Sequence, residues 1–219
     1  MAHRHAANRP EGYVPAAGHD LLLPLYDPML RLLLRERTLR DRFLDLAATL
    51  PGQRVLDIGC GTGTLLLLLK QRHADVEAVG IDGDPKALAI AAAKAAKQGA
   101  AIRFEEALAM QLPFGEARFD RVLSSLMLHH LTRDEKLAAL REARRVLAPG
   151  GSFHLVDFAA PRTALARIAT HLFHHDGRME DNLEGRIPAL LREAGFARVE
   201  ERGYHNSLLG TFVFVSAWT

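Results

Sequence analysis

The chain has 219 residues, a length at which one α/β domain with a single core is the default expectation. Hydrophobic residues make up 48% and charged residues 25% of the chain, which is ordinary for globular proteins and excludes a fibrous or largely disordered chain. The 28 Lys and Arg nearly balance the 26 Asp and Glu, so the net charge of +2 argues against a partner held by a strong positive field, such as nucleic acid.

The N-terminal region carries no targeting or membrane-spanning pattern. The first ten residues lack the apolar run of a secretory signal, and the apolar stretch 21–34 is interrupted by prolines and charges, so it is not predicted to be a transmembrane segment. The chain's single cysteine, Cys60, cannot form a disulfide within the chain. These features predict a cytoplasmic protein, in which the stretch 21–34 is still suited to lie against a lipid-like substrate.

The first fifty residues are expected to form an arm and a cover. Residues 1–18 show no hydrophobic period and predict a flexible arm. From Pro28 to Leu50 apolar residues recur at helical spacing, and Pro51 and Gly52 then end the segment. We therefore divide the chain into an arm and helical cover over 1–50 and a main domain over 51–219, which together make one folded unit.

Short β-rich runs alternate with amphipathic segments after residue 52. The expected strands are Arg54–Ile58, Val76–Ile81, Ile102–Glu105, Arg121–Ser124 and Ser152–Val156. The expected helices are Thr64–Gln71, Pro85–Gln98 and Arg133–Leu147. This alternation predicts a parallel sheet with helices on both faces.

The pattern changes beyond Asp157. Residues 161–173 and 187–194 are expected to be helices, whereas residues 199–204 and 211–215 are expected to be strands joined by a short connection. The predicted fold class is therefore α/β: a Rossmann-like, doubly wound, mostly parallel sheet with an antiparallel C-terminal edge strand and an N-terminal helical cover.

The most informative stretch is VLDIGCGTGT at residues 55–64, in which a strand runs into a glycine-rich turn and then a helix. Glycines let the backbone approach a ligand closely, and a helix N-terminus presents N–H groups to a carboxylate or phosphate. The G-x-G-x-G spacing matches a dinucleotide fingerprint only in part. Asp82 ends the next strand, where its carboxylate can accept hydrogen bonds from ribose hydroxyls, so the sequence predicts a nucleoside site.

Four segments in order, VLDIGCGTGT, VGIDGDPKAL, LPFGEARFDRVLSSLMLHHL and RVLAPGGSFHLVDF, resemble motifs of class I S-adenosylmethionine (SAM)-dependent methyltransferases. The resemblance runs from about residue 52 to residue 158 and is closest to the small-molecule methyltransferases of ubiquinone and menaquinone biosynthesis. It implies a Rossmann-like fold, SAM as cofactor and S-adenosylhomocysteine (SAH) as product.

The resemblance also implies roles for individual residues. It puts Asp82 on the ribose, Gly83 beside the adenine, and backbone groups of Ala107 and Leu108 along the adenine edge. Leu108 stands where relatives often have an Asp, and whether Glu106 compensates is left open. The methionine part of SAM is expected at residues 57–63, where the Cys60 side chain should pack rather than react. The full set of cofactor-binding residues predicted in this way is Tyr26, Asp57, Gly59, Cys60, Gly61, Thr62, Gly63, Asp82, Gly83, Ala107, Leu108 and Ser125.

Methyl transfer is an in-line displacement, so the protein chiefly has to align donor and acceptor and exclude water. An acceptor that must lose a proton would need a base, and histidine is the usual choice. His129 and His130 follow the fourth strand and Asp157 ends the fifth, at the carboxyl edge where ligands bind in such sheets. These three are the catalytic candidates, the alternative being supporting or capping roles.

Two other groups of residues are not interpreted as metal or nucleic-acid sites, and the first is expected to be a solvated or substrate-lining helix end. His171 and His175 have helical spacing, with His174 and Asp176 beside them, but no third ligand is evident, so no metal site is predicted. The arginines of residues 141–145 are interpreted as the solvent face of a helix rather than a nucleic-acid patch.

The sequence thus predicts an enzyme, a SAM-dependent methyltransferase that modifies an O, N or C atom of a small, partly apolar molecule, and a lipid-like acceptor is left open. One rival is an NAD-dependent oxidoreductase, which the missing third glycine and the Pro149-Gly150-Gly151 turn oppose. Others are a SAM- or SAH-binding protein without catalysis and a methyltransferase acting on a lipid headgroup or a macromolecule. The oligomeric state is left open.

Overall fold

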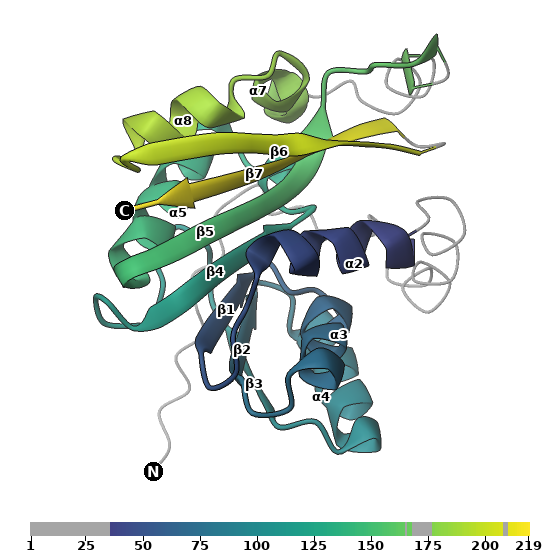
Figure 1. The fold of residues 1–219 in the computed structure, drawn as a ribbon, viewed down its shortest axis with the longest axis vertical. Coiled ribbons are helices and arrows are strands. Elements are labelled where there is room, and N and C mark those ends of the chain that lie inside the picture. Colours follow the sequence, from purple (N-terminus) through teal and green to yellow (C-terminus); the bar gives the residue numbers. More distant parts are fainter. Residues whose placement is uncertain (1–35, 165, 168–176, 208–209) are drawn as a thin grey trace.

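The computed structural model describes residues 36–164, 166–167, 177–207 and 210–219. Within these residues the chain forms one seven-stranded sheet with the order β3-β2-β1-β4-β5-β7-β6 (Figure 1). The strands are β1 (Arg54–Ile58), β2 (Glu77–Asp82), β3 (Ile102–Glu106), β4 (Phe119–Ser125), β5 (Leu147–Ala159), β6 (Arg198–Ser207) and β7 (Gly210–Trp218).

The first five strands pair in parallel, whereas β7 pairs antiparallel with both β5 and β6. The predicted α/β fold, a mostly parallel sheet with an antiparallel C-terminal part, is confirmed. In detail β7 lies inside the sheet and β6 forms the edge, because the hairpin places the last strand against β5. The chain order reverses between β1 and β4, and ligands bind beside such a switch point in doubly wound sheets.

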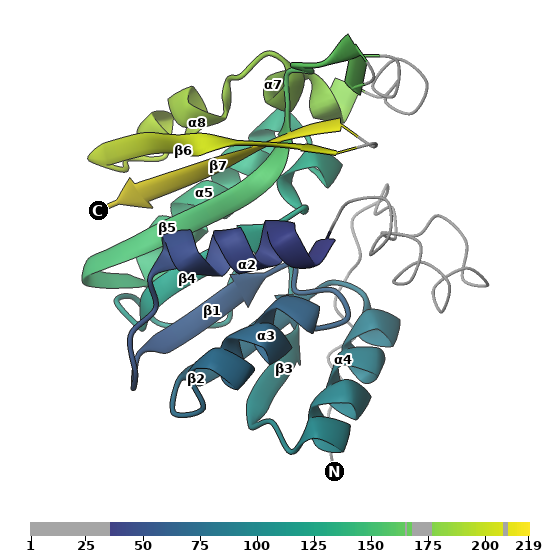
Figure 2. The same ribbon diagram turned by 45° about the vertical axis from the view of Figure 1, so that its right-hand side comes forward.

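Helices cover both faces of the sheet (Figure 2). They are α2 (Glu36–Ala47), α3 (Thr64–Arg72), α4 (Pro85–Gln98), α5 (Arg133–Val146), α7 (Glu180–Leu183) and α8 (Ile187–Glu193), with short 3-10 helices η2 (Leu128–His130) and η3 (Gly177–Met179). One buried core joins α2 and α3 to the sheet, and a second joins α5 and α8 to the opposite face. None of the helices in the described ranges is long and apolar enough to cross a membrane.

Local capping explains why the bounds of α4 were predictable. The Asp84 side chain accepts a hydrogen bond from the Lys86 N–H at 2.9 Å, Pro85 occupies the first turn, and Gly99 closes the helix with a φ of 63°. At α5, Thr132 and Glu135 form a reciprocal capping box. These short-range signals lie in the sequence itself, so they fix helix ends without tertiary information.

The strand β5 differs from its prediction. It begins at Leu147 rather than Ser152, because Leu147 pairs with Phe119 before a register shift restores pairing at Arg121 and Ser152. The segment Pro149-Gly150-Gly151, expected as a turn, is therefore part of β5, and Gly150 has a φ of 76° that favours glycine. The cover helix is described only from Glu36, and most of the helix predicted for 161–173 lies outside the described residues.

Candidate functional site

The loop between β1 and α3 forms a cradle of backbone groups. Gly59, Gly61 and Gly63 all have positive φ, at 73°, 53° and 75°. The N–H groups of Gly59 and Cys60 both donate to the Ile81 carbonyl at 2.9 Å, which ties the loop to the end of β2. A Cβ at Gly61 would meet open space, whereas one at Gly63 would lie 2.9 Å from the Ala91 Cβ. The loop is thus closely packed against α4 at Gly63, and it leaves open space for a ligand at Gly61.

Asp57 lies beneath this cradle with its side chain sealed from solvent. The residue is 1% exposed, and in the described part of the chain neither carboxylate oxygen has a hydrogen-bond partner. Burial raises the pKa of Asp57 to about 8, with Arg40 opposing the shift and Asp82 adding to it. A buried acceptor without a donor is costly, so this carboxylate fits a ligand that brings a cation, such as the amino group of SAM.

Asp82 ends β2 beside the cradle. Its Oδ2 accepts from the Gly61 N–H at 2.8 Å and its Oδ1 from the Asp84 N–H at 2.9 Å. Burial raises the pKa of Asp82, against the lowering effect of these hydrogen bonds. Each oxygen has a further lone pair for a ribose hydroxyl, so the geometry fits the predicted nucleoside contact.

The residues predicted to border the adenine lie at the same carboxyl edge of the sheet as Asp82. Gly83 comes directly after Asp82 and is half-buried. The Ala107 N–H donates to the Asp82 carbonyl at 3.1 Å, and the Leu108 carbonyl accepts from the Gln111 N–H at 3.1 Å. Glu106 is exposed. The structure therefore brings residues 107–108 next to the backbone of Asp82.

The other predicted cofactor residues lie at the same edge or outside the described residues. Cys60 is 8% exposed, burial raises the pKa of its thiol, and its Sγ would lie 2.8 Å from a Cβ at Gly80, so it packs as expected. Thr62 accepts from the ammonium group of Lys94 on α4 at 2.8 Å, a neighbour that the sequence did not indicate. Ser125 ends β4, half-buried, and Tyr26 lies outside the described residues.

His129 and Asp157 form a buried pair across the ends of β4 and β5. The His129 Nδ1 lies 2.7 Å from the Asp157 Oδ1, and the His129 backbone N–H donates to the other oxygen at 3.3 Å. The side chains are 12% and 0% exposed. Burial alone would raise the pKa of Asp157, but the charge and hydrogen bond of His129 lower it.

His130 does not share this arrangement. Its ring contacts that of His129 at a tilt of 41°, with centroids 4.0 Å apart. Burial lowers the pKa of His130 to about 3, with His129 and Arg178 adding to the effect and Asp157 opposing it. Of the two candidate histidines, only His129 has a carboxylate to orient its ring among the described residues.

The backbone bend at Leu126 is a feature of the site that the sequence did not indicate. Its φ of 56° is rare for a residue with a side chain, and its N–H donates to the Val156 carbonyl at 2.9 Å. The next residue, Met127, has its Cγ only 2.3 Å from where a Cβ on Gly59 would lie. The strained bend thus presses Met127 onto the glycine cradle, and the sequence carries no local signal for it.

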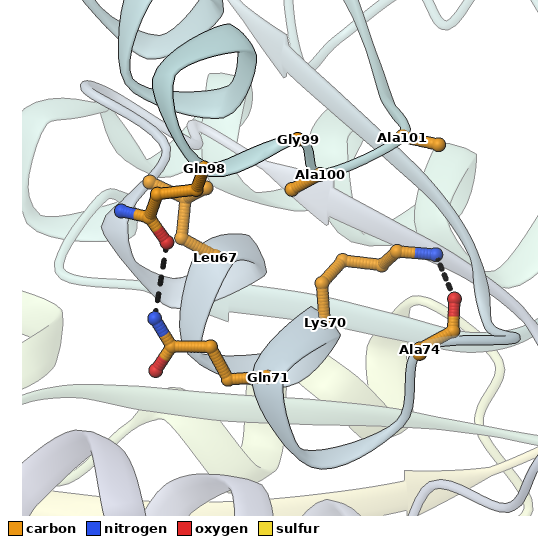
Figure 3. Close-up of a pocket in the computed structure, with 8 residues that line it drawn as sticks. All are labelled: Leu67, Lys70, Gln71, Ala74, Gln98, Gly99, Ala100 and Ala101. Atoms are coloured by element: carbon orange, nitrogen blue, oxygen red, sulfur yellow. Dashed lines mark hydrogen bonds between the residues drawn. The ribbon is translucent and has the colours of Figure 1, made fainter.

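A hollow of about 320 Å³ lies away from these residues (Figure 3). It is lined by the ends of α3 and α4, where Gln71 donates to Gln98 at 3.0 Å and Lys70 donates to the Ala74 and Val76 carbonyls. These residues precede β2 and β3, so the hollow opens at the amino edge of the sheet, opposite the cradle. Its polar side chains are already bonded to one another or to the backbone.

Within the described ranges no three His, Cys, Asp or Glu side chains gather as metal ligands would. The group His171, His174 and His175 with Asp176 lies outside those ranges. Of the arginines expected on the solvent face of α5, Arg144 donates to the Gly195 carbonyl at 2.8 Å and Arg145 to the Phe114 carbonyl at 2.8 Å. These two side chains therefore tie α5 to neighbouring segments.

Comparison with known proteins agrees with this geometry. A family described as "Methyltransferase domain" matches residues 55–151. An uncharacterised methyltransferase of Synechocystis is 36% identical over 165 residues, which are 74% of each chain. The chain belongs to the class I SAM-dependent methyltransferases.

Two further similarities concern a named relative and a solved structure. The demethylmenaquinone methyltransferase of Thermus thermophilus is 42% identical over 142 residues, which are 64% of each chain, so the match spans a little under two thirds of that relative. A SAM-dependent methyltransferase structure from Aquifex aeolicus superposes with a TM-score of 0.68 at 20% identity, over 90% of this chain and 96% of that one. The second similarity confirms the Rossmann-like methyltransferase fold.

Proposed function

We propose that this methyltransferase transfers the methyl group of SAM to an O, N or C atom of a small, partly apolar acceptor, with His129 as the base. The observation that carries the proposal is the buried His129–Asp157 pair, 2.7 Å apart, at the carboxyl edge of the sheet that also carries the glycine cradle. A histidine oriented by a buried carboxylate is a common arrangement for proton abstraction near neutral pH.

The cofactor is held by groups that fit SAM. The Asp57 carboxylate would take the amino group, the cradle of residues 59–63 the rest of the methionine part, and the Asp82 carboxylate the ribose hydroxyls. Gly83, Ala107 and Leu108 would border the adenine. When bound there, SAM supplies a methyl group on a positively charged sulfur, so the protein need not activate the donor.

His129 would act as the general base toward the acceptor. The Asp157 carboxylate accepts the Nδ1 proton of His129, which leaves Nε2 with a lone pair to take a proton from the acceptor. The Asp157 charge then stabilises the imidazolium that forms, in a site from which water is largely excluded. His130, neutral and in contact with the ring of His129, would support that ring rather than exchange protons.

The acceptor class is suggested by apolar neighbours of this pair. Phe158 meets His129 edge-on with centroids 4.9 Å apart, and Met127 packs on the cradle. A relative named for demethylmenaquinone supports an acceptor with an ionisable hydroxyl on an apolar ring. We therefore favour a phenol or reduced quinone, lipid-like molecules included, over a macromolecule.

The proposed organisation keeps the chain as one folded unit with residues 1–50 as the cover. Support comes from α2, in which Leu39 and Phe43 are buried in the core shared with β1 and α3. The cytoplasmic location stays a prediction from the sequence.

The test is transfer of isotope-labelled methyl from SAM to a reduced naphthoquinone with one prenyl unit, and to host-cell extract separated into organic, small aqueous and macromolecular fractions. The wild type is compared with His129→Gln, Asp157→Asn and, as a cofactor-site control, Asp82→Ala. We expect labelling of small molecules that falls at least a hundredfold in the first two variants while SAH affinity is kept. Label confined to macromolecules, or full activity of His129→Gln, would contradict the proposal.

A further inference from the structure

One lysine of the structure is completely buried. Lys136 lies on α5, a helix whose polar residues otherwise mark it as a surface helix, yet it is 0% exposed. Its ammonium group donates to the Arg178 carbonyl and lies 3.4 Å from Oδ2 of Asp181, which is itself 4% exposed. A buried lysine is rare unless it is paired, so this contact is a specific feature of the fold.

The buried pair joins two segments that are far apart in the sequence. Lys136 belongs to α5, whereas Arg178 and Asp181 belong to η3 and α7, residues 177–183. The other oxygen of Asp181 accepts from Arg133 at 2.8 Å, and this second bond also comes from α5. The segment 177–183 is thereby fastened to the start of α5.

A second fastening ties the same segment to the proposed active site. The Asn182 side chain, 1% exposed, donates to the Phe158 carbonyl at 3.3 Å at the end of β5. Phe158 meets the His129 ring edge-on, and its backbone N–H donates to Asp157 at 2.7 Å. Figure 1 shows α7 beside this end of β5, and η3 packs against η2, which carries His129 and His130.

Stability is a poor explanation for the buried pair. Removing two charges from water costs several kcal/mol, and well-packed apolar residues of the same volume often do as well or better. What an ion pair adds over an apolar contact is a defined geometry between the two segments that it joins, since its hydrogen bonds are directional.

We infer that Lys136 and Asp181 are positioning residues that hold residues 177–183 against His129 and His130 and so shape the acceptor side of the site. This inference rests on the proposed function for its catalytic meaning. The segment then forms one wall of the acceptor site, and it sets how closely the ring of an acceptor can approach His129.

The test uses the full-length chain with the double variant K136M/D181N, which removes both charges and nearly keeps the volume. The matched control is Lys97→Met, the same change at an exposed position of α4. Three quantities are compared: amide hydrogen exchange of residues 177–183, the NMR-detected protonation of His130 at pH 5.5, and SAH affinity by calorimetry. The kinetic readout is kcat/KM for the reduced prenyl-naphthoquinone.

In the double variant we expect exchange at residues 177–183 to speed up at least tenfold and His130, neutral in the wild type at pH 5.5, to become partly protonated as its cover loosens. The kcat/KM for the acceptor should fall at least tenfold, mainly through KM, while SAH affinity stays within twofold. The control should match the wild type in every measurement.

A folded double variant with unchanged exchange, His130 protonation and KM would overturn the inference. If the double variant does not fold, Lys136→Met alone gives the same readouts, because it leaves Asp181 paired with Arg133. If the wild type does not methylate the naphthoquinone, the proposed acceptor class fails, whereas the exchange and NMR measurements still decide whether the pair holds the segment.

Discussion

Binding of SAM should release a proton from Asp57. In the described structure this carboxyl is buried without a hydrogen-bond partner, and burial raises its pKa to about 8. At pH 7 it is then roughly nine-tenths protonated, and ionising it costs about 1.4 kcal/mol. The amino group of SAM carries a positive charge at that pH, so the bound state favours the carboxylate and the proton leaves.

Calorimetry at pH 7 in buffers of different ionisation enthalpy measures this directly, because the observed binding enthalpy varies with the buffer in proportion to the protons released. We expect roughly 0.9 proton per SAM for the wild type and about none for Asp57→Asn, which should also bind SAM more weakly. Affinity should fall about tenfold for each pH unit below 8, and fall again above 8 as the amino group loses its proton. Wild-type binding that releases no proton at pH 7, or release that persists in Asp57→Asn, would refute the reasoning.

Three other predictions concern single residues. Asp82→Ala should weaken SAH binding by about 1 to 3 kcal/mol, since the ribose hydroxyls lose a charged acceptor; calorimetry on the folded variant checks this. Gly63→Ala should lower the free energy of unfolding by about 1 to 3 kcal/mol in urea titrations, because its φ is 75° and the new methyl would lie 2.9 Å from the Ala91 Cβ. Burial lowers the pKa of His154 from 6.5 to about 3, so the unfolded chain binds a proton that the native state excludes. His154 should therefore lower stability as pH drops below 6.5, by roughly 2 kcal/mol at pH 5. In thermal unfolding, His154→Gln should remove this part of the pH dependence and leave the similar part that His130 contributes.

The sequence predicted those parts of the fold whose determinants are local. The helix Pro85–Gln98 was predicted to the residue because its cap residues, Asp84 and Gly99, adjoin it. The strand β5 was predicted to begin five residues too late, because its first residue pairs with Phe119, 28 positions earlier, and no local sequence pattern indicates that contact. Hydrophobic periodicity alone likewise cannot show that the last strand, β7, lies between β5 and β6 in the sheet.

The candidate site divides in the same way. The glycines and Asp82 lie in contiguous motifs, so their juxtaposition followed from a strand, a turn and a helix in order. The pairing of His129 with Asp157 spans 28 residues and depends on β4 and β5 being neighbours, so the sequence offered His129 and His130 equally. The burial of Lys136 could not be predicted, because an amphipathic helix predicts a solvated lysine and because its partner Asp181 follows 45 residues later.

Two aspartates at the carboxyl edge of the sheet show how the site separates its tasks. Asp57 lies near the end of β1 and Asp157 near the end of β5, on either side of β4, and both are almost completely buried. Their pKa values nevertheless move in opposite directions, because Asp157 has His129 as a donor and Asp57 has none in the described structure. Environments that move apart the pKa values of two similar acids commonly mark different roles. The unpaired carboxylate suits a cation brought by the cofactor, whereas the paired one already orients a base, so loss of Asp57 should affect SAM binding and loss of Asp157 the turnover of bound SAM.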